Sequence, residues 1–583
     1  MVNLEMNGYQ MYDFIAAGAK KVIANQKYLN KINVFPIADG DTGSNLAFTM
    51  NNIIRNSKRD KSVSATLESI AKYALEASYG NSGTIVASYF NGLAKETQNK
   101  DKITMKEFAN YLANSVTYAY NSITMPKEGT ILTVMREWGD YLLKNIENHK
   151  DLNSLFNSSV KYLSGIVEKT KTQLAELRQA NVVDAGAKAF VYFIEGIHEF
   201  ISTGVVSNKA DNYTIPLEML DLHQNIVFRY CSEFDIVLKD ANSLDRIKNH
   251  LSRYGDSIIV SERRDYLKIH IHTDQPEKVA LFLRSYGKII GSKVDDMLIQ
   301  YEIANNRKHK IGFITDSIAD LPEEFIFNHQ ISVLPLQMIA DGEVYLDRVT
   351  ITTRNIYKVL DNAEEFPKSS QPSDSYIRKT LEYLIQHFDY IIGVFISSKM
   401  SGTYSKVKTI AQEIAPDKIL IYDSKVNSGA EGLVARKAAL AISSGKSIEE
   451  IDKEIRKTIE NTDIYVEIPD LSYAVQSGRV PAVVGKIANM FKLKVIISID
   501  DEGEGTVKKD RSIKKVIKKL AKKNNVKEYV IIHSSKKNKV DEIVKYATSM
   551  IGFAPAYVNS VSAVITALVG RDSLGIAYEK KTG

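Results

Sequence analysis

The spacing of apolar residues changes twice along this chain of 583 residues, and the changes divide it into three parts. From about residue 8 to 203, apolar residues recur every three or four positions, as in ATLESIAKYALEAS, which predicts helices almost throughout. From residue 206, segments such as SIIVSERRDYLKIHIHT predict strands, and PEKVALFLRSYG predicts a helix. Beyond residue 307, short apolar strands alternate with helices. One hydrophobic core rarely serves so long a chain, so the sequence predicts several domains.

The predicted domains are an all-α domain of roughly eight helices at 1–205, a small α+β domain at 206–306 and an α/β domain at 307–583. In the last domain the strands KIGFITDS, YIIGVFISS, KILIYDS and EYVIIHSS are expected to form a parallel sheet. Strands that alternate with helices are typical of that architecture, and its ligands bind at the carboxyl ends of the strands.

Charge and cysteine content exclude several classes of protein. The 76 Lys and Arg residues against 70 Asp and Glu residues leave a net charge of +6, too small to indicate a nucleic-acid partner. Cys231 is the only cysteine, which excludes an internal disulfide and fits a reducing compartment. No apolar run approaches the length of a membrane span. We therefore expect a cytoplasmic protein.

The segment NVFPIADGDTGSN, residues 33–45, places two carboxylates one residue apart in a turn before a predicted helix. Asp39 and Asp41 can point at one centre, and two hard oxygen ligands suit Mg²⁺, which completes its shell with water and phosphate oxygens. Thr42 and Ser44 can add hydroxyl contacts. The alternative is a turn that only caps the helix.

Three further segments place glycine and hydroxyl residues at predicted helix starts. They are GNSGT at 80–84, EGT at 128–130 and VVDAGA at 182–187. The free N–H groups and the dipole at a helix N-terminus favour a phosphate. Four such starts in one helical domain therefore predict an anion site.

In this order, across residues 8–203, the four motifs resemble the ATP-binding domain of the dihydroxyacetone-kinase-like (DhaL-type) family, a barrel of antiparallel helices that holds nucleotide and Mg²⁺ at one end. The resemblance implies that Asp39 and Asp41 ligate the metal. The sugar-kinase members carry a third aspartate upstream, whereas this chain has Asn33 there, a weaker ligand. The NVFP form is instead similar to the kinase component of bacterial fatty acid kinase. The cofactor-binding residues implied are Thr42, Ser44, Asn45, Ser82, Gly83, Gly129, Thr130, Asp184 and Gly186.

A second candidate metal site lies in the predicted α+β domain. His270 and His272 are two residues apart in LKIHIHTD, so on a strand both imidazoles face the same side. With Cys231 of RYCSEF they can form a three-residue Zn²⁺ set that leaves a fourth position open. Alternatively, the histidine pair marks an exposed strand face. YCSEF and HIHTDQP resemble the middle domain of the fatty acid kinase, and this resemblance favours zinc.

Hydroxyl residues cluster after predicted strands of the α/β domain, in TDSIADLP, SSQPS and MSGTYS. In this order they resemble the DegV family of fatty-acid-binding proteins over residues 308–583. The resemblance implies a lipid buried between two subdomains, with its carboxylate at Ser369, Ser370, Ser401 and Thr403. Family members typically have a histidine near the end of the chain for this carboxylate, but ITALVGRDSLG has Leu568 there.

One basic segment, KKDRSIKKVIKKLAKKNNVK at 508–527, predicts an amphipathic helix. Its apolar stripe consists of Ile513, Val516, Ile517 and Leu520. The helix is expected either to pack on the sheet or to make transient contact with an anionic membrane surface.

These resemblances together predict a fused fatty acid kinase, which uses ATP and Mg²⁺ to phosphorylate the carboxylate of a fatty acid held by the DegV-like domain. The acyl phosphate would pass to a downstream acyltransferase in phospholipid synthesis. Two alternatives stay open: a kinase of a small hydroxylated metabolite, and a non-enzymatic lipid carrier or sensor with a regulatory nucleotide domain. Transfer within one chain or between the chains of a homodimer is also open.

Overall fold

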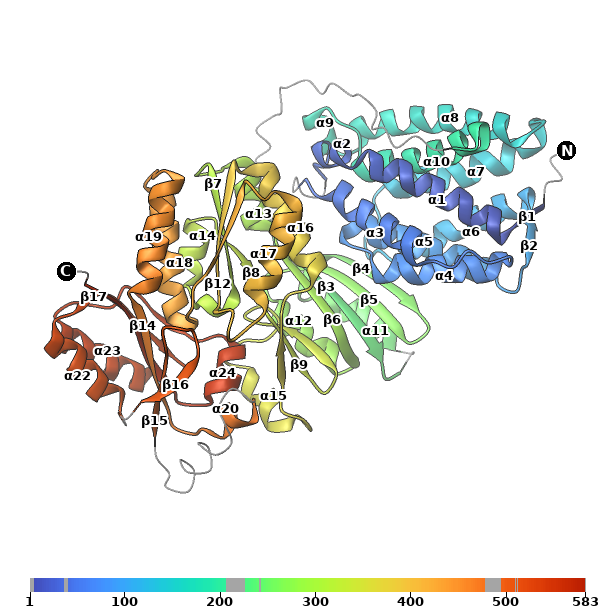
Figure 1. Cartoon of the computed structure of the whole chain (residues 1–583). Coiled ribbons are helices and arrows are strands. Elements are labelled where there is room, and N and C mark those ends of the chain that lie inside the picture. Colours follow the sequence, from blue (N-terminus) through green and yellow to red (C-terminus); the bar gives the residue numbers. More distant parts are fainter. Residues whose placement is uncertain are drawn as a thin grey trace. The chain divides into compact units, whose positions relative to one another are not determined.

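The structure, a computed structural model, describes residues 5–35, 40–205, 226–240, 243–477, 494–508, 510 and 512–581 (Figure 1). The chain divides into two compact units, Met1–Tyr301 and Glu302–Gly583. The predicted helical and α+β parts both lie in the first unit, and the predicted α/β part forms the second. The predicted multidomain fold class is confirmed. Within the described ranges, no helix is both long enough and apolar enough to cross a lipid bilayer.

Helices packed around one apolar core form the first part of unit 1. Its described residues contain α1 (Gly8–Ala24), α2 (Gln26–Lys31), α3 (Thr42–Asn56), α4 (Val63–Glu76), α5 (Gly80–Glu96), α6 (Met105–Asn121), α7 (Ile131–Asn145), α8 (Leu152–Gln173), α9 (Ala175–Ala180) and α10 (Ala185–Thr203), with the paired strands β1 (Glu5–Asn7) and β2 (Lys102–Thr104). The number exceeds the roughly eight expected because α2 and α9 have only 6 residues each, too few to show a clear period.

The periodic spacing in the sequence decides which helix faces are buried. In α4, Val63, Leu67 and Ile70 point into the core, and the Ser62 side chain caps the helix by accepting a hydrogen bond from the next turn. Trp138 of α7 lies fully inside this core, with its ring centroid 5.7 Å from that of Phe190 of α10. Such aromatic contacts fix how the helices pack, and with them the positions of the helix ends.

A four-stranded antiparallel sheet forms the second part of unit 1. Its order is β4-β5-β3-β6, with β3 (Tyr230–Leu238), β4 (Gly255–Arg263), β5 (Tyr266–Thr273) and β6 (Gly287–Asp296), followed by α13 (Met297–Asn305). The predicted strands and the helix α12 (Pro276–Arg284) are confirmed, and α11 (Leu244–Leu251) is additional. Phe234 and Ile269 of one sheet face pack against Leu251 and Val279 of these two helices. The opposite face is polar.

Unit 2 contains two larger sheets with different topologies. The first has the order β13-β12-β7-β8 and is wholly parallel, with β7 (Ile311–Asp316), β8 (Ser332–Leu334), β12 (Tyr390–Phe395) and β13 (Ile419–Asp423). The second has the order β16-β15-β14-β19-β17-β18, with β14 (Thr462–Ile468), β15 (Val495–Ile499), β16 (Gly505–Lys508), β17 (Val526–His533), β18 (Val558–Ser560) and β19 (Leu574–Lys580). In this sheet only β17 and β18 pair in parallel.

The predicted single parallel sheet is therefore wrong for EYVIIHSS, which is β17 of the second sheet. The local pattern was misleading because β17, helix α23 (Lys537–Ile551) and β18 do form a parallel unit. The antiparallel partner β19 comes from the end of the chain and pairs between β17 and β14.

Helices cover the sheets of unit 2, and a small sheet of order β10-β9-β11 completes it. The basic helix α22 buries its predicted stripe beside Tyr529 and Ile576, so this apolar face packs on the sheet, as in the first of the two expectations. The remaining elements are η3 (Ser317–Ala319), α14 (Glu323–Asn328), β9 (Gln337–Ala340), β10 (Glu343–Leu346), α15 (Ile356–Asn362), β11 (Lys368–Ser370), α16 (Asp374–His387), α17 (Thr403–Ile414), α18 (Ser428–Ser443), α19 (Ile448–Glu460), α20 (Ser472–Gln476), α22 (Ile513–Lys523) and α24 (Ala563–Val569).

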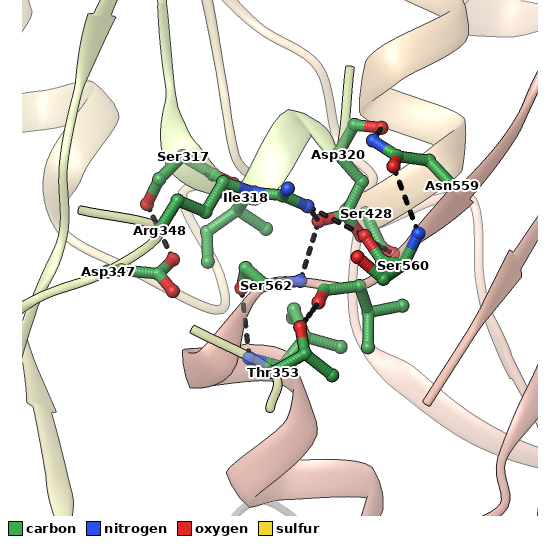
Figure 2. A network of polar contacts seen from close by, with 12 residues as sticks. Ser317, Ile318, Asp320, Asp347, Arg348, Thr353, Ser428, Asn559, Ser560 and Ser562 are labelled. Carbon is green, nitrogen blue, oxygen red and sulfur yellow. Dashed lines mark hydrogen bonds and ion pairs between the residues drawn. The ribbon is translucent and has the colours of Figure 1, made fainter. Parts of the chain in front are cut away.

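A buried polar network ties the loop after β7 to the segment that leads into α24 (Figure 2). Asp320 forms an ion pair with Arg348 and accepts a hydrogen bond from the Ser562 N–H at 2.8 Å. Arg348 also donates to the Ser560 carbonyl at 2.9 Å. Asp347 accepts from the N–H of Ala563 at 2.8 Å, in the first turn of α24. The network fixes the position of α24, which matters for the cavity described below.

Two further carboxyl groups, Asp316 and Glu431, are fully buried near this network. Burial raises the pKa of Asp316 to about 7. Burial and the neighbouring Asp316 raise the pKa of Glu431 well above its usual range. Unfolded carboxyl groups titrate near pH ~4, so above that pH the folded chain holds protons that the unfolded chain has released. The stability that these protons provide is lost as pH rises through the folded-state pKa values.

We therefore expect the unfolding midpoint of unit 2 to fall between pH 5 and pH 8 by about 5 °C or more. Glu431→Gln, which removes one of the two acids, should make this fall clearly smaller. The measurement is thermal unfolding of the full chain followed by calorimetry at several pH values. Glu502→Gln, at an exposed position, is the matched control and should behave like wild type. Equal pH slopes in wild type and Glu431→Gln would contradict the expectation.

Candidate functional site

The four predicted helix starts are present, and contacts between them bring them together in unit 1. They are the first turns of α3, α5, α7 and α10. A side chain at Gly186 of α10 would lie 2.9 Å from the Ser82 hydroxyl of α5 and 3.3 Å from Ile131 of α7. Gly80 of α5, at φ +64°, leaves no room for a side chain beside the Asn45 amide of α3. The glycines therefore permit the close approach of these helix ends.

Asp184 caps α10 and also connects it to α7. Its carboxylate accepts a hydrogen bond from the Ala187 N–H at 2.7 Å. Burial raises the pKa of Asp184 to about 7, although hydrogen bonds from the backbone of Ala187, Ile131 and Gly186 oppose the rise. Asp184 therefore holds two helix starts in one arrangement.

Asp41 is the residue that precedes α3, but its side chain caps none of the N–H groups in the fully described first turn of that helix. Its partner in the predicted metal site, Asp39, lies outside the described residues. Asn33 is buried, and its side-chain oxygen accepts a hydrogen bond from the Thr42 hydroxyl. This bond connects Asn33 to the first residue of α3.

The other predicted nucleotide residues divide into two groups. Asn45, Thr42 and Ser82 line a small hollow together with Asp41 and Asn33. The remaining ones are not among the residues that line it, and several make structural contacts. The Ser44 hydroxyl accepts hydrogen bonds from Gln26 and Asn30 of α2 at 3.0 and 2.9 Å, the Gly129 N–H donates to Thr133, the Thr130 hydroxyl donates to the Lys127 carbonyl, and Gly83 packs on Thr49.

Strand register places the candidate zinc ligands on the polar face of the four-stranded sheet. Cys231 of β3 lies opposite His272 of β5, and Glu233 lies opposite His270. The ligand atoms of the cysteine and the two histidines all lie within 4.8 Å of one another. The His270 Nε2 atom is buried and has no hydrogen-bond partner among the described residues. One sulfur and two imidazole nitrogens at such separations fit a zinc ion.

The three candidate zinc ligands line the same hollow as Asp41, Asn45 and Ser82. The volume of this hollow is about 40 Å³, enough for an ion with a small oxygen ligand. The sequence placed these two sets of residues in separate domains and did not indicate that they meet. Both sets belong to unit 1, and α5 packs against β4 and β5.

Glu233 is a site residue that the sequence reasoning missed. Its Oε1 atom accepts a hydrogen bond from the Gly80 N–H at 2.6 Å and lies 3.5 Å from His270 Nδ1. Burial would raise the pKa of Glu233, but Lys293, His270 and Lys268 outweigh it and hold the pKa far below its usual range. Glu233 therefore connects the three candidate zinc ligands (Cys231, His270 and His272, called the Cys231 cluster) to the start of α5 at GNSGT. The signal was present in YCSEF, because residues 231 and 233 share a strand face.

Two buried lysines supply positive charge at this site. Lys293 Nζ lies 4.2 Å from the ring centroid of Tyr79, and Lys268 Nζ lies 5.2 Å from it. Lys293 also pairs with Asp295 at 2.8 Å. Tyr79 directly precedes α5 and lines the hollow. Lys268 likewise lies 3.5 Å from Asp235, so the charges of both lysines are offset by carboxylates, and neither lysine is among the residues that line the hollow.

Unit 2 contains a much larger cavity of about 940 Å³. Its walls come from the second large sheet, from loops that follow strands of the first, and from α24, and many of them are Ile, Val and Leu side chains, for example Ile396, Ile464 and Val564. Three of the predicted substrate-binding residues, Ser369, Ser370 and Ser401, line it. The buried Thr403 does not, but its hydroxyl lies 2.9 Å from that of Ser401. An apolar cavity with a few hydroxyl groups suits a long ligand with one polar end.

Comparisons with known families match all three parts of the chain. The DAK2 domain matches residues 36–199, the FakA-like middle domain of fatty acid kinases matches 227–304, and the DegV family matches 310–581.

Among curated proteins, an uncharacterised protein of Staphylococcus aureus strain USA300 is 28% identical over 319 residues, which are 52% of this chain and 58% of that protein. The chain thus spans little more than half the length of this relative. Among solved structures, DegV, a fatty acid binding protein from Bacillus subtilis, is 27% identical, with a TM-score of 0.41, over 47% of this chain and 100% of its own. A fatty acid binding DegV family protein from Streptococcus agalactiae is 26% identical over the same shares, with a TM-score of 0.42.

Proposed function

We propose that this chain, in which a DAK2 domain and a FakA-like middle domain are joined to a DegV domain, phosphorylates a fatty acid that its own DegV domain binds. The observation that carries the proposal is the occurrence, in one chain, of a small polar hollow at converging helix starts and an apolar cavity edged by serine hydroxyls. Phosphoryl transfer depends mainly on positioning and charge neutralisation, which such a hollow can provide.

In the proposed reaction a carboxylate oxygen of the fatty acid attacks the γ-phosphorus of ATP. The bond from that phosphorus to the oxygen bridging to the β-phosphate breaks, and ADP leaves with its electron pair. The carboxylate is ionised at neutral pH, so no strong general base is required.

The residues of the hollow divide the work as follows. Asp41, with Asp39, would hold Mg²⁺, which when bound neutralises phosphate charge. The N–H groups of the first turn of α5 that follow Gly80, with the Ser82 hydroxyl, would orient the phosphates. Lys268 and Lys293, whose Nζ atoms lie close to the Tyr79 ring, add positive charge. Asn33 holds the turn that carries Asp41.

Cys231, His270 and His272 would hold Zn²⁺ at the wall of this hollow. Zinc, when bound there, would act as a Lewis acid or would fix the sheet against the nucleotide loops. Glu233 positions His270 and Gly80 relative to each other in either case.

The test is to incubate the purified full-length chain with γ-labelled ATP, Mg²⁺ and oleate, and to trap acyl phosphate with hydroxylamine. We expect fatty acyl hydroxamate in proportion to ADP formed, and none without oleate. Binding of both ligands without hydroxamate would refute the kinase proposal and favour the carrier or sensor alternative. Hydroxamate is specific for the acyl phosphate, so ADP formed with a small hydroxylated metabolite instead would point to the other kinase alternative.

A further inference from the structure

One buried carboxylate contacts both candidate sites of unit 1. Glu233 of β3 is 2% exposed, and its Oε1 atom accepts a hydrogen bond from the Gly80 N–H at 2.6 Å. The same oxygen lies 3.5 Å from the His270 Nδ1 atom. Gly80 is the first residue of α5, and His270 belongs to the Cys231 cluster. A single oxygen atom therefore lies between the candidate nucleotide site and the candidate zinc site.

The backbone at Gly80 is held in one conformation. Its φ of +64° favours glycine, and an added side chain would lie 2.7 Å from the Asn45 amide of α3. Glu233 satisfies the Gly80 N–H, whereas Tyr79, which precedes α5, provides no side-chain cap. The other N–H groups of the first turn are those proposed to meet a phosphate. The position of Glu233 therefore affects how this helix start is presented to a phosphate.

The two ring nitrogens of His270 have different surroundings. Nδ1 faces Glu233, and Nε2 is buried and has no hydrogen-bond partner within the described ranges. Zinc held at Nε2 would leave a proton on Nδ1, directed at the carboxylate, as is common around ligating histidines. Nδ1 also lies 3.8 Å from Cys231 Sγ. Zinc held by this sulfur would remove it as a competing acceptor, so the ion would strengthen the bond from His270 to Glu233.

Directed contacts hold the Glu233 carboxylate at one oxygen only. Its Oε2 atom is buried and has no hydrogen-bond partner in the part of the chain that the structure describes. The orientation of the carboxylate therefore depends on the two contacts of Oε1, to Gly80 and to His270. A change at either contact affects the other.

We propose that Glu233 couples the two sites, so that zinc at the Cys231 cluster and a nucleotide at the start of α5 each raise the affinity of the chain for the other. The inference rests on the proposed function in that zinc and a Mg²⁺-nucleotide are the two ligands. Zinc orients the His270 ring, the ring orients the Glu233 carboxylate, and the carboxylate orients the first N–H of α5. Glu233 is a positioning residue, because it is not among the residues that line the hollow.

The test measures both affinities on the full-length protein after a chelator has removed zinc. Wild type should bind ADP with Mg²⁺ about tenfold more tightly when zinc is saturating. It should bind zinc, followed with a competing chromophoric chelator, more tightly by the same factor when ADP is saturating, because linkage makes the two effects equal. Glu233→Gln keeps an oxygen for the Gly80 N–H but lacks the charge that strengthens the bond from His270. The factor should therefore fall to about twofold or less. A merely structural defect would weaken both ligands without changing this factor.

Glu262→Gln is the matched control. Glu262 of β4 also joins the sheet to α5, through an ion pair with Lys95 at 3.6 Å, but neither residue is among those that line the hollow. This variant should keep the wild-type factor. A folded Glu233→Gln variant that keeps it too would overturn the inference. If Glu233→Gln fails to fold, Glu233→Asp, which keeps the charge but is too short to contact both partners, decides by the same measurement.

Failure of the coupling can be distinguished from failure of the proposed function. Wild type that binds zinc and ADP independently but forms hydroxamate would overturn the coupling and leave the kinase proposal intact. Wild type that binds no zinc would also overturn the coupling, and hydroxamate formation would still decide the kinase proposal. Wild type that binds no nucleotide would refute both.

Discussion

Replacing Asp41 with asparagine should lower the rate of oleate-dependent acyl phosphate formation by about a hundredfold or more. The amide has nearly the shape of the carboxylate but lacks the charge that holds Mg²⁺ beside the phosphates. Because the substitution nearly preserves the shape of the side chain, the unfolding midpoint should change little. The measurements are hydroxamate formation and thermal unfolding on the same preparations.

Asp140→Asn, at an exposed position of α7 in the same part of unit 1, is the matched control and should keep wild-type activity. Raising the Mg²⁺ concentration should recover part of the Asp41→Asn rate, because weaker metal binding is the expected defect. An Asp41→Asn variant with wild-type activity would contradict the assignment of Asp41. A variant that is inactive because it has unfolded would be recognised by its lost thermal transition, and Asp41→Ser would then take its place.

Replacing Cys231 with serine should remove zinc from the purified protein. We expect wild type to contain about one zinc per chain and Cys231→Ser less than about a tenth of that, because the thiolate is the softest ligand of the set. Elemental analysis after extensive dialysis gives the stoichiometry. Since Cys231 is the only cysteine, labelling with a thiol reagent should also be slower in zinc-loaded wild type than after chelation.

His250→Asn, in α11 of the same domain, is the control and should keep its zinc. Because the Cys231 cluster lines the hollow that also contains Asp41, the loss of zinc should lower kinase activity by more than about tenfold. Full activity in a zinc-free variant would show that the ion is not required for the reaction. A wild-type protein that contains no zinc and does not take it up would remove zinc from the proposal.

The parts of the site that the sequence predicted depend on local backbone geometry. A helix begins where capping and glycine residues precede a periodic apolar run, so the starts of α3, α5, α7 and α10 were readable from four short motifs. Residues two apart on a strand share a face, so the position of His270 and His272 on one face was also predictable. Neither argument needs more than a few neighbouring residues.

The parts that were missed depend on contacts between distant segments. Glu233 lies 153 residues from Gly80, which donates a hydrogen bond to it. No local pattern indicates that a strand of the middle sheet lies against a helix start of the first part. The same reason explains β17, whose partner β19 comes from the end of the chain.

The sequence by itself determined that the chain has a helical, an α+β and an α/β part. It also determined the helix starts that favour phosphate and the shared strand face of His270 and His272, with Cys231 as a candidate third ligand. Only the tertiary structure decided that this face and Asp41 line one hollow, and that Ser369, Ser401 and Val564 line one cavity of unit 2. Periodicity fixes what each segment buries, because it follows from the geometry of one helix or strand. Which buried faces meet is decided by burial and register across the whole unit, and no short window of sequence contains that information.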